Sequence, residues 1–511
     1  MMKKMKLTLA GLLVLVTGII YGQTTITLYP DQAETKISKE IYGHFAEHLG
    51  RCIYGGIFVG EDSDIPNTRG FRDDVTGALI DMKIPLLRWP GGCFADTYNW
   101  KDGIGPRQER PSMVNVHWGG VTEDNSFGTH EFLDFCELIN AEPYINVNVG
   151  SGTVREASEW IEYVTSSNIS PMTDLRKKNG REEPWDVKYW GIGNENWGCG
   201  GEMTPEYYSD VYRNYASYAR GARYKIACGA SDSDYNWTDV LMKKMQGKRN
   251  IMQGLSLHYY TITHNWQKKG SATDFDENEW FTTLNKTLFM DELIQKHSTI
   301  MDKYDPEKRI GLIVDEWGNW FDVEPGTNPG FLYQQNTLRD ALVAGINLNI
   351  FNNHADRVKM SNIAQTINVL QSVILTKDDE MVLTPTYYVF KMYSVHQEAT
   401  MLPATVKTGE YKMDRRSVPT VNASASTKDG VVSVTICNLN PNESESVEIT
   451  IPGSDFSEAS GQIISAQKMN AYNDFGKEEL VSMKEFAVAK PKNGKLTLEL
   501  PSKSVVLVQL K

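Results

Sequence analysis

Two glutamates in similar surroundings are the residues of this chain best suited to chemistry. Glu195 stands in WGIGNENWG, where a short β-branched and aromatic run gives way to turn residues. Glu316 stands in RIGLIVDEWGNW, after an apolar run typical of a strand buried on both faces. A pair of carboxyls can hydrolyse a glycosidic bond, because one protonates the leaving oxygen while the other attacks the sugar or activates water.

The side chains around these glutamates favour a sugar site. Asn194 brings an amide that can donate and accept, and the neighbouring tryptophans offer flat apolar surfaces. A partly apolar pocket raises the pKa of a carboxyl, as a proton donor requires. Each glutamate alone could be an ordinary solvated loop residue, but two in matching contexts make that reading a poor explanation of both.

The elements that must position these residues alternate between strand and helix. We predict strands at 41–49, 84–93, 142–149, 185–192, 225–230, 254–260, 310–314 and 347–351, and helices between them at 73–82, 129–141, 155–164, 205–224, 238–245, 279–304 and 333–344. Eight parallel βα units predict a (β/α)8 TIM barrel, whose active site lies at the carboxyl ends of the strands. Glu195 would end strand four and Glu316 strand seven, so the two would face each other across the mouth.

The pattern changes after about residue 381. Residues 418–510 contain short alternating runs separated by turn residues, which is typical of an antiparallel β-sandwich. The isolated strand-like run near residues 24–30 is expected to join that sandwich. We therefore predict an N-terminal strand segment at 23–37, a catalytic barrel at 38–385 and a β-sandwich domain at 386–511.

Charge and the N-terminus bear on partners and location. The net charge of −13 argues against nucleic acid and against anionic membrane surfaces as partners. Lys3, Lys4 and Lys6 precede an apolar stretch at 7–20 that is short for a membrane span. This pattern predicts a signal peptide at 1–22 and export to the periplasm or the exterior, with no membrane span in the mature chain. A retained anchor stays an alternative.

Cysteines and histidines give no metal pattern. The six cysteines, at 52, 93, 136, 199, 228 and 437, form neither a disulfide framework nor a zinc motif, so their pairing stays open. His44, His48 and His117 lack ligand spacing. We predict a site without metal or cofactor.

Six motifs together resemble one known family. In chain order they are GHFAEHLGRCIYGGI, LRWPGGCFADTYNWKDGIGP, KYWGIGNENWGCGG, SLHYY, IVDEWGNW and NIAQTINVLQ, and they span the whole predicted barrel. They resemble the α-L-arabinofuranosidases of glycoside hydrolase family 51. The resemblance implies a barrel with a jelly-roll-like sandwich, and a retaining, metal-independent exo-hydrolase. It also implies arabinan, arabinoxylan or derived oligosaccharides as substrates and a homo-oligomer, often a hexamer.

The resemblance carries roles to individual residues. Glu195 would be the general acid/base, Glu316 the nucleophile, and Asn194 the partner of the sugar 2-hydroxyl. The further sugar-site residues that we expect are Glu47, Arg88, Cys93, Trp100, His258, Tyr260, Trp320 and Gln365. Cys93 departs from the family pattern, because many members carry asparagine there, so its contact with the sugar stays open.

Alternatives remain for residues and for function. Arg88 could be a barrel salt-bridge residue, His258 a satisfied core histidine, and Gln365 a helix cap. Another retaining barrel hydrolase, an endoglucanase or a β-xylosidase, would carry the same pair of glutamates. A non-catalytic carbohydrate-binding barrel is the third possibility, and the presence of both glutamates argues against it.

Overall fold

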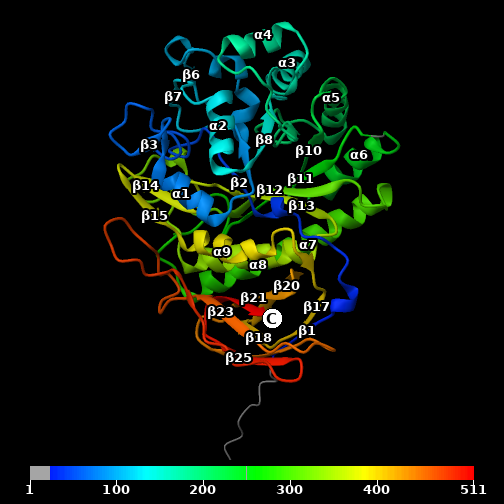
Figure 1. Ribbon diagram of the computed structural model, residues 1–511, viewed down its shortest axis with the longest axis vertical. Helices are drawn as coiled ribbons and strands as arrows, with labels where there is room; N and C mark the ends of the chain where they lie inside the picture. Colours follow the sequence, from blue (N-terminus) through cyan, green and yellow to red (C-terminus); the bar gives the residue numbers. More distant parts are fainter. Residues whose placement is uncertain (1–23, 249) are drawn as a thin grey trace, which may run out of the picture.

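A closed barrel of eight parallel strands is the larger part of the computed structural model, which describes residues 24–248 and 250–511 (Figure 1). In chain order the strands are β2 (Gly43–Phe45), β5 (Leu86–Trp89), β8 (Glu142–Val147), β9 (Tyr189–Ile192), β10 (Tyr224–Ser231), β11 (Gly254–Thr261), β12 (Gly311–Asn319) and β13 (Val358–Ala364). β13 pairs with β2 in parallel and closes the ring. The predicted signal peptide at 1–22 lies outside the described residues.

Helices follow the strands and cover the outside of the barrel. They are α1 (Asp73–Met82), α2 (Thr129–Ile139), α3 (Val154–Thr165), α4 (Pro171–Lys178), α5 (Pro205–Tyr218), α6 (Tyr235–Met245), α7 (Glu277–Tyr304), α8 (Leu338–Asn353) and α9 (Pro385–Tyr393). Capping side chains fix the residue at which several of these helices begin. Thr153 and Glu156 form a capping box at α3, and Asp276 and Glu279 form one at α7. The helices thereby set where each connecting loop leaves its strand.

Two sheets form the second domain. One contains β1 (Thr24–Leu28), β17 (Ala404–Lys407), β22 (Glu445–Thr450) and β25 (Lys495–Leu500). The other contains β16 (Thr400–Met401), β20 (Val421–Lys428), β21 (Val431–Asn438), β23 (Ala459–Ile464), β24 (Met483–Glu485) and β26 (Ser504–Leu510). Their apolar residues form a core of their own. β1 pairs antiparallel with β17 but parallel with β22, an exception within an otherwise antiparallel domain.

The barrel and the sandwich are joined through α8 and α9, which lie between them (Figure 1). Asn349 and Asn352 of α8 donate to Asn422 and Ser424 of β20, at 2.8 and 3.1 Å. Within the described residues, four short antiparallel pairs of strands lie outside the barrel and the two sandwich sheets. They are β3 (Asn67–Thr68) with β4 (Phe71–Arg72), β6 (Met113–Val114) with β7 (Thr122–Glu123), β14 (Ile374–Lys377) with β15 (Glu380–Leu383), and β18 (Glu410–Met413) with β19 (Arg416–Pro419).

The predicted (β/α)8 barrel with a C-terminal β-sandwich is confirmed, but the predicted eighth strand was wrong. Residues 347–351 belong to helix α8, and β13 is the eighth strand. Nearly every residue of α8 is buried, so its sequence lacks the polar face that marks a surface helix. The correction places Gln365 directly after a barrel strand. The domain boundaries at 37/38 and 385/386 stay predictions.

Candidate active site

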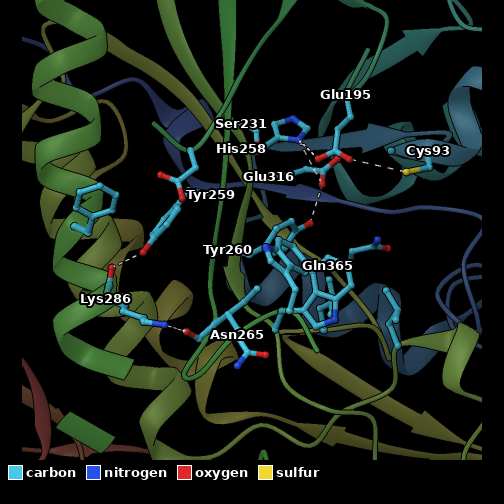
Figure 2. Close-up of a pocket in the computed structure, with 18 of the residues that line it drawn as sticks. Cys93, Glu195, Ser231, His258, Tyr259, Tyr260, Asn265, Lys286, Glu316 and Gln365 are labelled. Atoms are coloured by element: carbon cyan, nitrogen blue, oxygen red, sulfur yellow. Dashed lines mark hydrogen bonds and ion pairs between the residues drawn. The ribbon is translucent and has the colours of Figure 1, made fainter. Parts of the chain in front are cut away.

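Glu316 is the sixth of the nine residues of β12 and is held by two donors. Nη1 of Arg88 lies 2.9 Å from its Oε1. The Tyr260 hydroxyl donates to its Oε2 at 2.7 Å (Figure 2). The side chain is 7% exposed. Arg88 is the next-to-last residue of β5 and Tyr260 lies in β11, so three barrel strands fix one carboxyl. A guanidinium and a phenol together stabilise a negative charge on Glu316.

Glu195 has different surroundings, because it lies in the turn after β9 rather than in a strand. Its backbone φ of 42° is in the left-handed region, where a non-glycine residue is uncommon and often marks a functional site. Its side chain is 18% exposed, and its Oε1 lies 2.9 Å from Nδ1 of His258. Burial, with the charge of Glu316, raises its pKa, although His258 opposes the shift.

The two carboxyls and His258 are close neighbours. An oxygen of Glu195, an oxygen of Glu316 and a ring nitrogen of His258 all lie within 4.8 Å of one another. His258 also reaches down to Asp315, with Nε2 3.1 Å from Oδ1. Burial lowers the pKa of His258, but Glu316, Asp315 and Glu195 outweigh it and raise the pKa to about 10. The imidazole is therefore a cation that both carboxyls of the site share.

Asp315 supports this arrangement from below and was missed by the sequence analysis. It accepts from the Tyr144 hydroxyl at 2.8 Å and lies 3.7 Å from Nε of Arg88. Burial raises its pKa, but Arg88, His258 and Tyr144 together bring it below the usual value. Its position next to Glu316 on a buried strand was the available signal, because a buried carboxylate needs cationic partners.

Glu47, after β2, forms a second buried polar cluster beside Glu316. The backbone N–H groups of Gly92 and Phe94 donate to its Oε1 at 3.0 and 3.1 Å. Trp118 also donates to Oε1, at 2.9 Å, and Gln365 donates to Oε2 at 2.9 Å. Burial, with the charge of Glu316, raises the pKa of Glu47 to about 7. Trp118 was not among the predicted residues, since nothing in its local sequence separates it from a core tryptophan.

The loop after β5 comes very close to both carboxyls. A Cβ on Gly91 would lie 2.6 Å from Cγ of Glu47, and a Cβ on Gly92 would lie 2.9 Å from Oε1 of Glu316. Larger residues would push these carboxyls out of place, which is the physical reason for the Gly-Gly pair.

Two amide side chains at the site, those of Asn194 and Gln365, each keep one atom without a hydrogen-bond partner in the described part of the chain. Asn194 accepts from Nη2 of Arg88 at 2.6 Å, and this leaves its Nδ2 unpaired. Gln365 donates to Glu47 and leaves its Oε1 unpaired. Buried polar groups normally find partners, so these two atoms are ready to bind a polar ligand.

A cleft of about 1010 Å³ opens above these residues. Glu47, Glu195, His258, Tyr260, Glu316 and Gln365 line it, as do Cys93 and the tryptophans Trp118, Trp197, Trp266 and Trp320. Trp320 packs edge-on against Tyr260 and against Trp266, with ring centroids 5.0 and 5.2 Å apart. Trp266 is 59% exposed. The outer part of the cleft is therefore aromatic, as sugar-binding surfaces often are.

The predicted place of Trp100 in the sugar site was wrong, because this residue does not line the cleft. Its side chain is buried, stacks on Trp160 of α3 and donates from Nε1 to the Glu156 carbonyl at 3.0 Å. It begins a short 3-10 helix that packs against α3. Trp100 therefore belongs to the core and not to the sugar site. Arg88 and Asn194 do not line the cleft either, but Arg88 donates to both Glu316 and Asn194. The other predicted site residues line it.

Cys93 forms a disulfide with Cys199, a pairing that the sequence left open. Its Sγ lies 3.9 Å from Oε2 of Glu195 (Figure 2). The remaining cysteines, Cys52, Cys136, Cys228 and Cys437, are free and buried.

In the described part of the chain, two groups of donor side chains are close enough to hold a cation, but the chemistry of their donors disfavours both. Cys93 and Cys199 lie near Glu195, yet a disulfide supplies no thiolate. His258 lies near Glu195 and Glu316, but both of its ring nitrogens already contact carboxyls. A metal ligand must be neutral imidazole, and His258 is cationic. The absence of metal and cofactor stays a prediction.

Comparisons with known proteins agree along most of the chain. Residues 78–279 match the family model described as "Alpha-L-arabinofuranosidase 1 domain", and residues 315–504 match "Alpha-L-arabinofuranosidase C-terminal domain". An "Intracellular exo-alpha-L-arabinofuranosidase" of Bacteroides ovatus is 55% identical over 492 residues, 95% of each chain. The chain belongs to the α-L-arabinofuranosidases of glycoside hydrolase family 51.

Solved structures of the family agree with this assignment. The GH51 arabinofuranosidase from Xanthomonas axonopodis pv. citri is 48% identical, with a TM-score of 0.94 over 96% of this chain and 100% of that one. An α-L-arabinofuranosidase from Thermotoga maritima, solved as an arabinose complex, is 30% identical, with a TM-score of 0.83 over 95% and 99%. This family 51 chain is therefore a glycoside hydrolase of the arabinofuranosidase type.

The predicted export was wrong. The Bacteroides ovatus relative, similar along 95% of both chains, is named as intracellular. A basic stretch followed by a short apolar stretch was the only basis for the signal peptide, and that pattern lies outside the described residues. Within the described residues, no helix is long and apolar enough to cross a membrane.

Proposed function

We propose that this family 51 enzyme is a retaining exo-hydrolase that removes terminal α-L-arabinofuranosyl residues from arabinan, arabinoxylan or derived oligosaccharides. The observation that carries the proposal is that one oxygen of Glu195 and one oxygen of Glu316 lie within 4.8 Å of each other across the cleft. Retaining glycosidases hold their carboxyls about 5–5.5 Å apart, whereas inverting ones leave about 6.5–9.5 Å for a water molecule.

In the first step Glu316 attacks the anomeric carbon while Glu195 protonates the departing glycosidic oxygen. Arg88 and Tyr260 donate to the two oxygens of Glu316 and hold its carboxyl in place for the attack. The raised pKa of Glu195 favours the protonated form, which the leaving oxygen needs. The result is a covalent arabinosyl–Glu316 ester and a released alcohol.

In the second step Glu195, now ionised, removes a proton from water as the water attacks the same carbon. Glu316 leaves as a carboxylate, and the sugar keeps its original configuration because two inversions occur. His258, shared between both carboxyls, screens their mutual repulsion when both are ionised. The free Nδ2 of Asn194 would donate to the sugar 2-hydroxyl, which supports its predicted role.

Exo action is supported by burial at the Glu47 side of the cleft. Glu47 and Gln365 are 2% and 1% exposed and hydrogen-bonded to each other, so no polymer can continue past them. Trp266 and Trp320 line the outer part, where the remainder of the substrate would lie. The predicted homo-oligomer, a hexamer by family resemblance, stays a prediction that light scattering can test.

A panel of nitrophenyl glycosides tests this proposal. We expect release of nitrophenol from the α-L-arabinofuranoside and much slower release from β-D-xyloside and β-D-glucoside. Arabinose should be the first sugar freed from arabino-oligosaccharides. Preferential hydrolysis of the xyloside or internal cleavage of a glucan would refute the proposal in favour of another barrel hydrolase.

A further inference from the structure

The Cys93–Cys199 disulfide joins the two loops that carry much of the site. Cys93 follows the Gly-Gly pair after β5, and Cys199 lies four residues beyond Glu195 in the loop after β9. The two cysteines are 106 residues apart in sequence, with Cα atoms 5.5 Å apart. The disulfide therefore ties the loop that touches Glu316 to the loop that bears Glu195.

Both sulfur atoms face the carboxyl of Glu195. Sγ of Cys199 lies 3.5 Å and Sγ of Cys93 lies 3.9 Å from Oε2, and Figure 2 shows the Cys93 sulfur pointing at that carboxyl. The other oxygen, Oε1, meets His258 at 2.9 Å. A disulfide sulfur carries no hydrogen, so it limits the space around Oε2 without donating to it. Among residues 24–248 and 250–511, no N–H or O–H group donates to Oε2.

The backbone around Glu195 needs external support. Its left-handed φ is unfavourable for a residue with a side chain. Before Glu195, Oδ2 of Asp96 accepts from the Asn194 N–H at 3.1 Å. After Glu195, the backbone N–H groups of Gly198 and Gly200 donate to the Glu195 carbonyl at 2.7 and 3.1 Å. Beyond that tight turn, the disulfide is the covalent anchor of the loop.

We propose that the Cys93–Cys199 disulfide is a positioning element for Glu195, which keeps Oε2 directed at the departing glycosidic oxygen. The inference rests on the acid/base role proposed above. Reduction by an added dithiol breaks the S–S bond, transfers two electrons and two protons to the cysteines and leaves the reductant as a disulfide. The two thiols can then rotate, donate S–H to Oε2 and let the loop move.

Loss of the disulfide should change the chemistry selectively. A misplaced acid slows the substrates whose leaving group needs protonation, and displacements of about 1 Å can cost about 10²-fold. We expect a loss of about 10- to 100-fold on arabino-oligosaccharides and only about 3-fold or less on dinitrophenyl arabinofuranoside, whose leaving group needs little help. A plain loss of stability would slow both substrates alike.

The experiment compares oxidised enzyme, dithiothreitol-treated enzyme and the double variant Cys93→Ser/Cys199→Ser on aryl arabinofuranosides of graded leaving-group pKa. For the reduced enzyme and for the double variant, we expect the hydrolysis rate to depend more steeply on leaving-group pKa. The basic limb of their pH profiles should also be displaced. Dithiothreitol should not alter the double variant. Cys136→Ala, in the core of α2, is the matched control and should keep the wild-type leaving-group dependence even if it lowers the Tm.

The outcomes separate this inference from the proposed function. If neither reduction nor the double variant changes the leaving-group dependence, the positioning role is wrong, whatever happens to the Tm. If the variant does not fold, the reduced wild-type enzyme decides, with its free thiols counted by alkylation. If Glu195→Ala itself shows no leaving-group dependence, the acid/base role of Glu195 fails first.

Discussion

The two glutamates of the site are held in opposite ways. Glu316 lies within a barrel strand, 7% exposed, with Arg88 and Tyr260 directed at its oxygens. Glu195 lies in a loop, 18% exposed, with a histidine at one oxygen and a disulfide at the other. One carboxyl is fixed by donors that stabilise negative charge. The other has an oxygen, Oε2, that accepts no N–H or O–H from the described residues and can carry a proton.

This difference explains how identical residue types take different roles. The donors to Glu316 stabilise a carboxylate that must attack and later leave. Burial and the nearby charge of Glu316 raise the pKa of Glu195, so it can hold a proton until the leaving oxygen takes it. Substitutions at Glu316 and at Glu195 should therefore differ in the size of their effect and in its dependence on substrate.

Removal of Glu316 should have the largest effect. Glu316→Ala lacks the atom that forms the covalent bond, so kcat/KM should fall about 10⁴- to 10⁶-fold for activated and natural substrates alike. Hydrolysis of nitrophenyl arabinofuranoside and of an arabino-oligosaccharide measures this. Glu307→Ala, a 73% exposed glutamate that pairs with Arg309, is the control and should leave both rates unchanged. A loss of less than about 10²-fold would contradict the role of Glu316.

Removal of Glu195 should be milder and selective. Glu195→Ala should slow oligosaccharide hydrolysis about 10²- to 10⁴-fold, but dinitrophenyl arabinofuranoside much less, since that leaving group departs without a proton. The pH dependence follows from the same role. Because kcat/KM falls as Glu195 loses its proton above its raised pKa, the variant should lack the basic limb of the profile. Equal losses on both substrates would show that Glu195 is not the acid.

Weakening the support of Glu316 should have a smaller effect. Tyr260→Phe keeps the ring against Trp320 but removes the 2.7 Å hydrogen bond to Oε2. A hydrogen bond to a charged group contributes about 1.5–3 kcal/mol, so kcat should fall about 10- to 100-fold. Tyr259→Phe is the matched control, because its hydroxyl donates to the Lys286 carbonyl away from both glutamates. If the two variants lose activity equally, the contact with Glu316 is not the cause.

The smallest effect should appear in stability rather than in chemistry. The pKa of Glu47 is about 7 in the folded protein against an ordinary 4.5, so the folded state binds its proton more tightly. This stabilisation is complete below pH 4.5 and is lost as the pH rises through about 7.

Glu47→Gln should abolish this loss of stability with rising pH, because an amide does not ionise. The Tm of the variant relative to wild type should therefore rise by about 2 °C between pH 5 and pH 8. Thermal melts at a series of pH values measure it, and Glu307→Gln, changed at an exposed position, is the control. Parallel curves for Glu47→Gln and wild type would show that Glu47 titrates normally.

The sequence predicts the parts of this molecule that follow regular periodicity. α1 spans the predicted residues 73–82. β9, which precedes Glu195, lies within the predicted 185–192, and β12 overlaps the predicted 310–314 but continues past Glu316. The eighth strand was misplaced because α8 is buried on all sides, and a short apolar run in such a helix looks like a strand.

Contacts between distant loops could not be predicted in the same way. The Cys93–Cys199 pairing, the Trp118 contact with Glu47 and the burial of Trp100 all depend on where loops meet in space. No local sequence pattern predicts these contacts between loops. Asp315 was overlooked for another reason, because its neighbour Glu316 already accounted for the motif.

The stereochemistry of azide rescue tests the division of roles most directly. In Glu316→Ala, azide should attack from the face that the missing carboxyl leaves open and give the inverted β-arabinofuranosyl azide. In Glu195→Ala, azide should attack the arabinosyl–Glu316 ester and give the retained α product. Proton NMR of the two products distinguishes the anomers. The opposite pair of anomers would show that the roles of Glu195 and Glu316 are reversed.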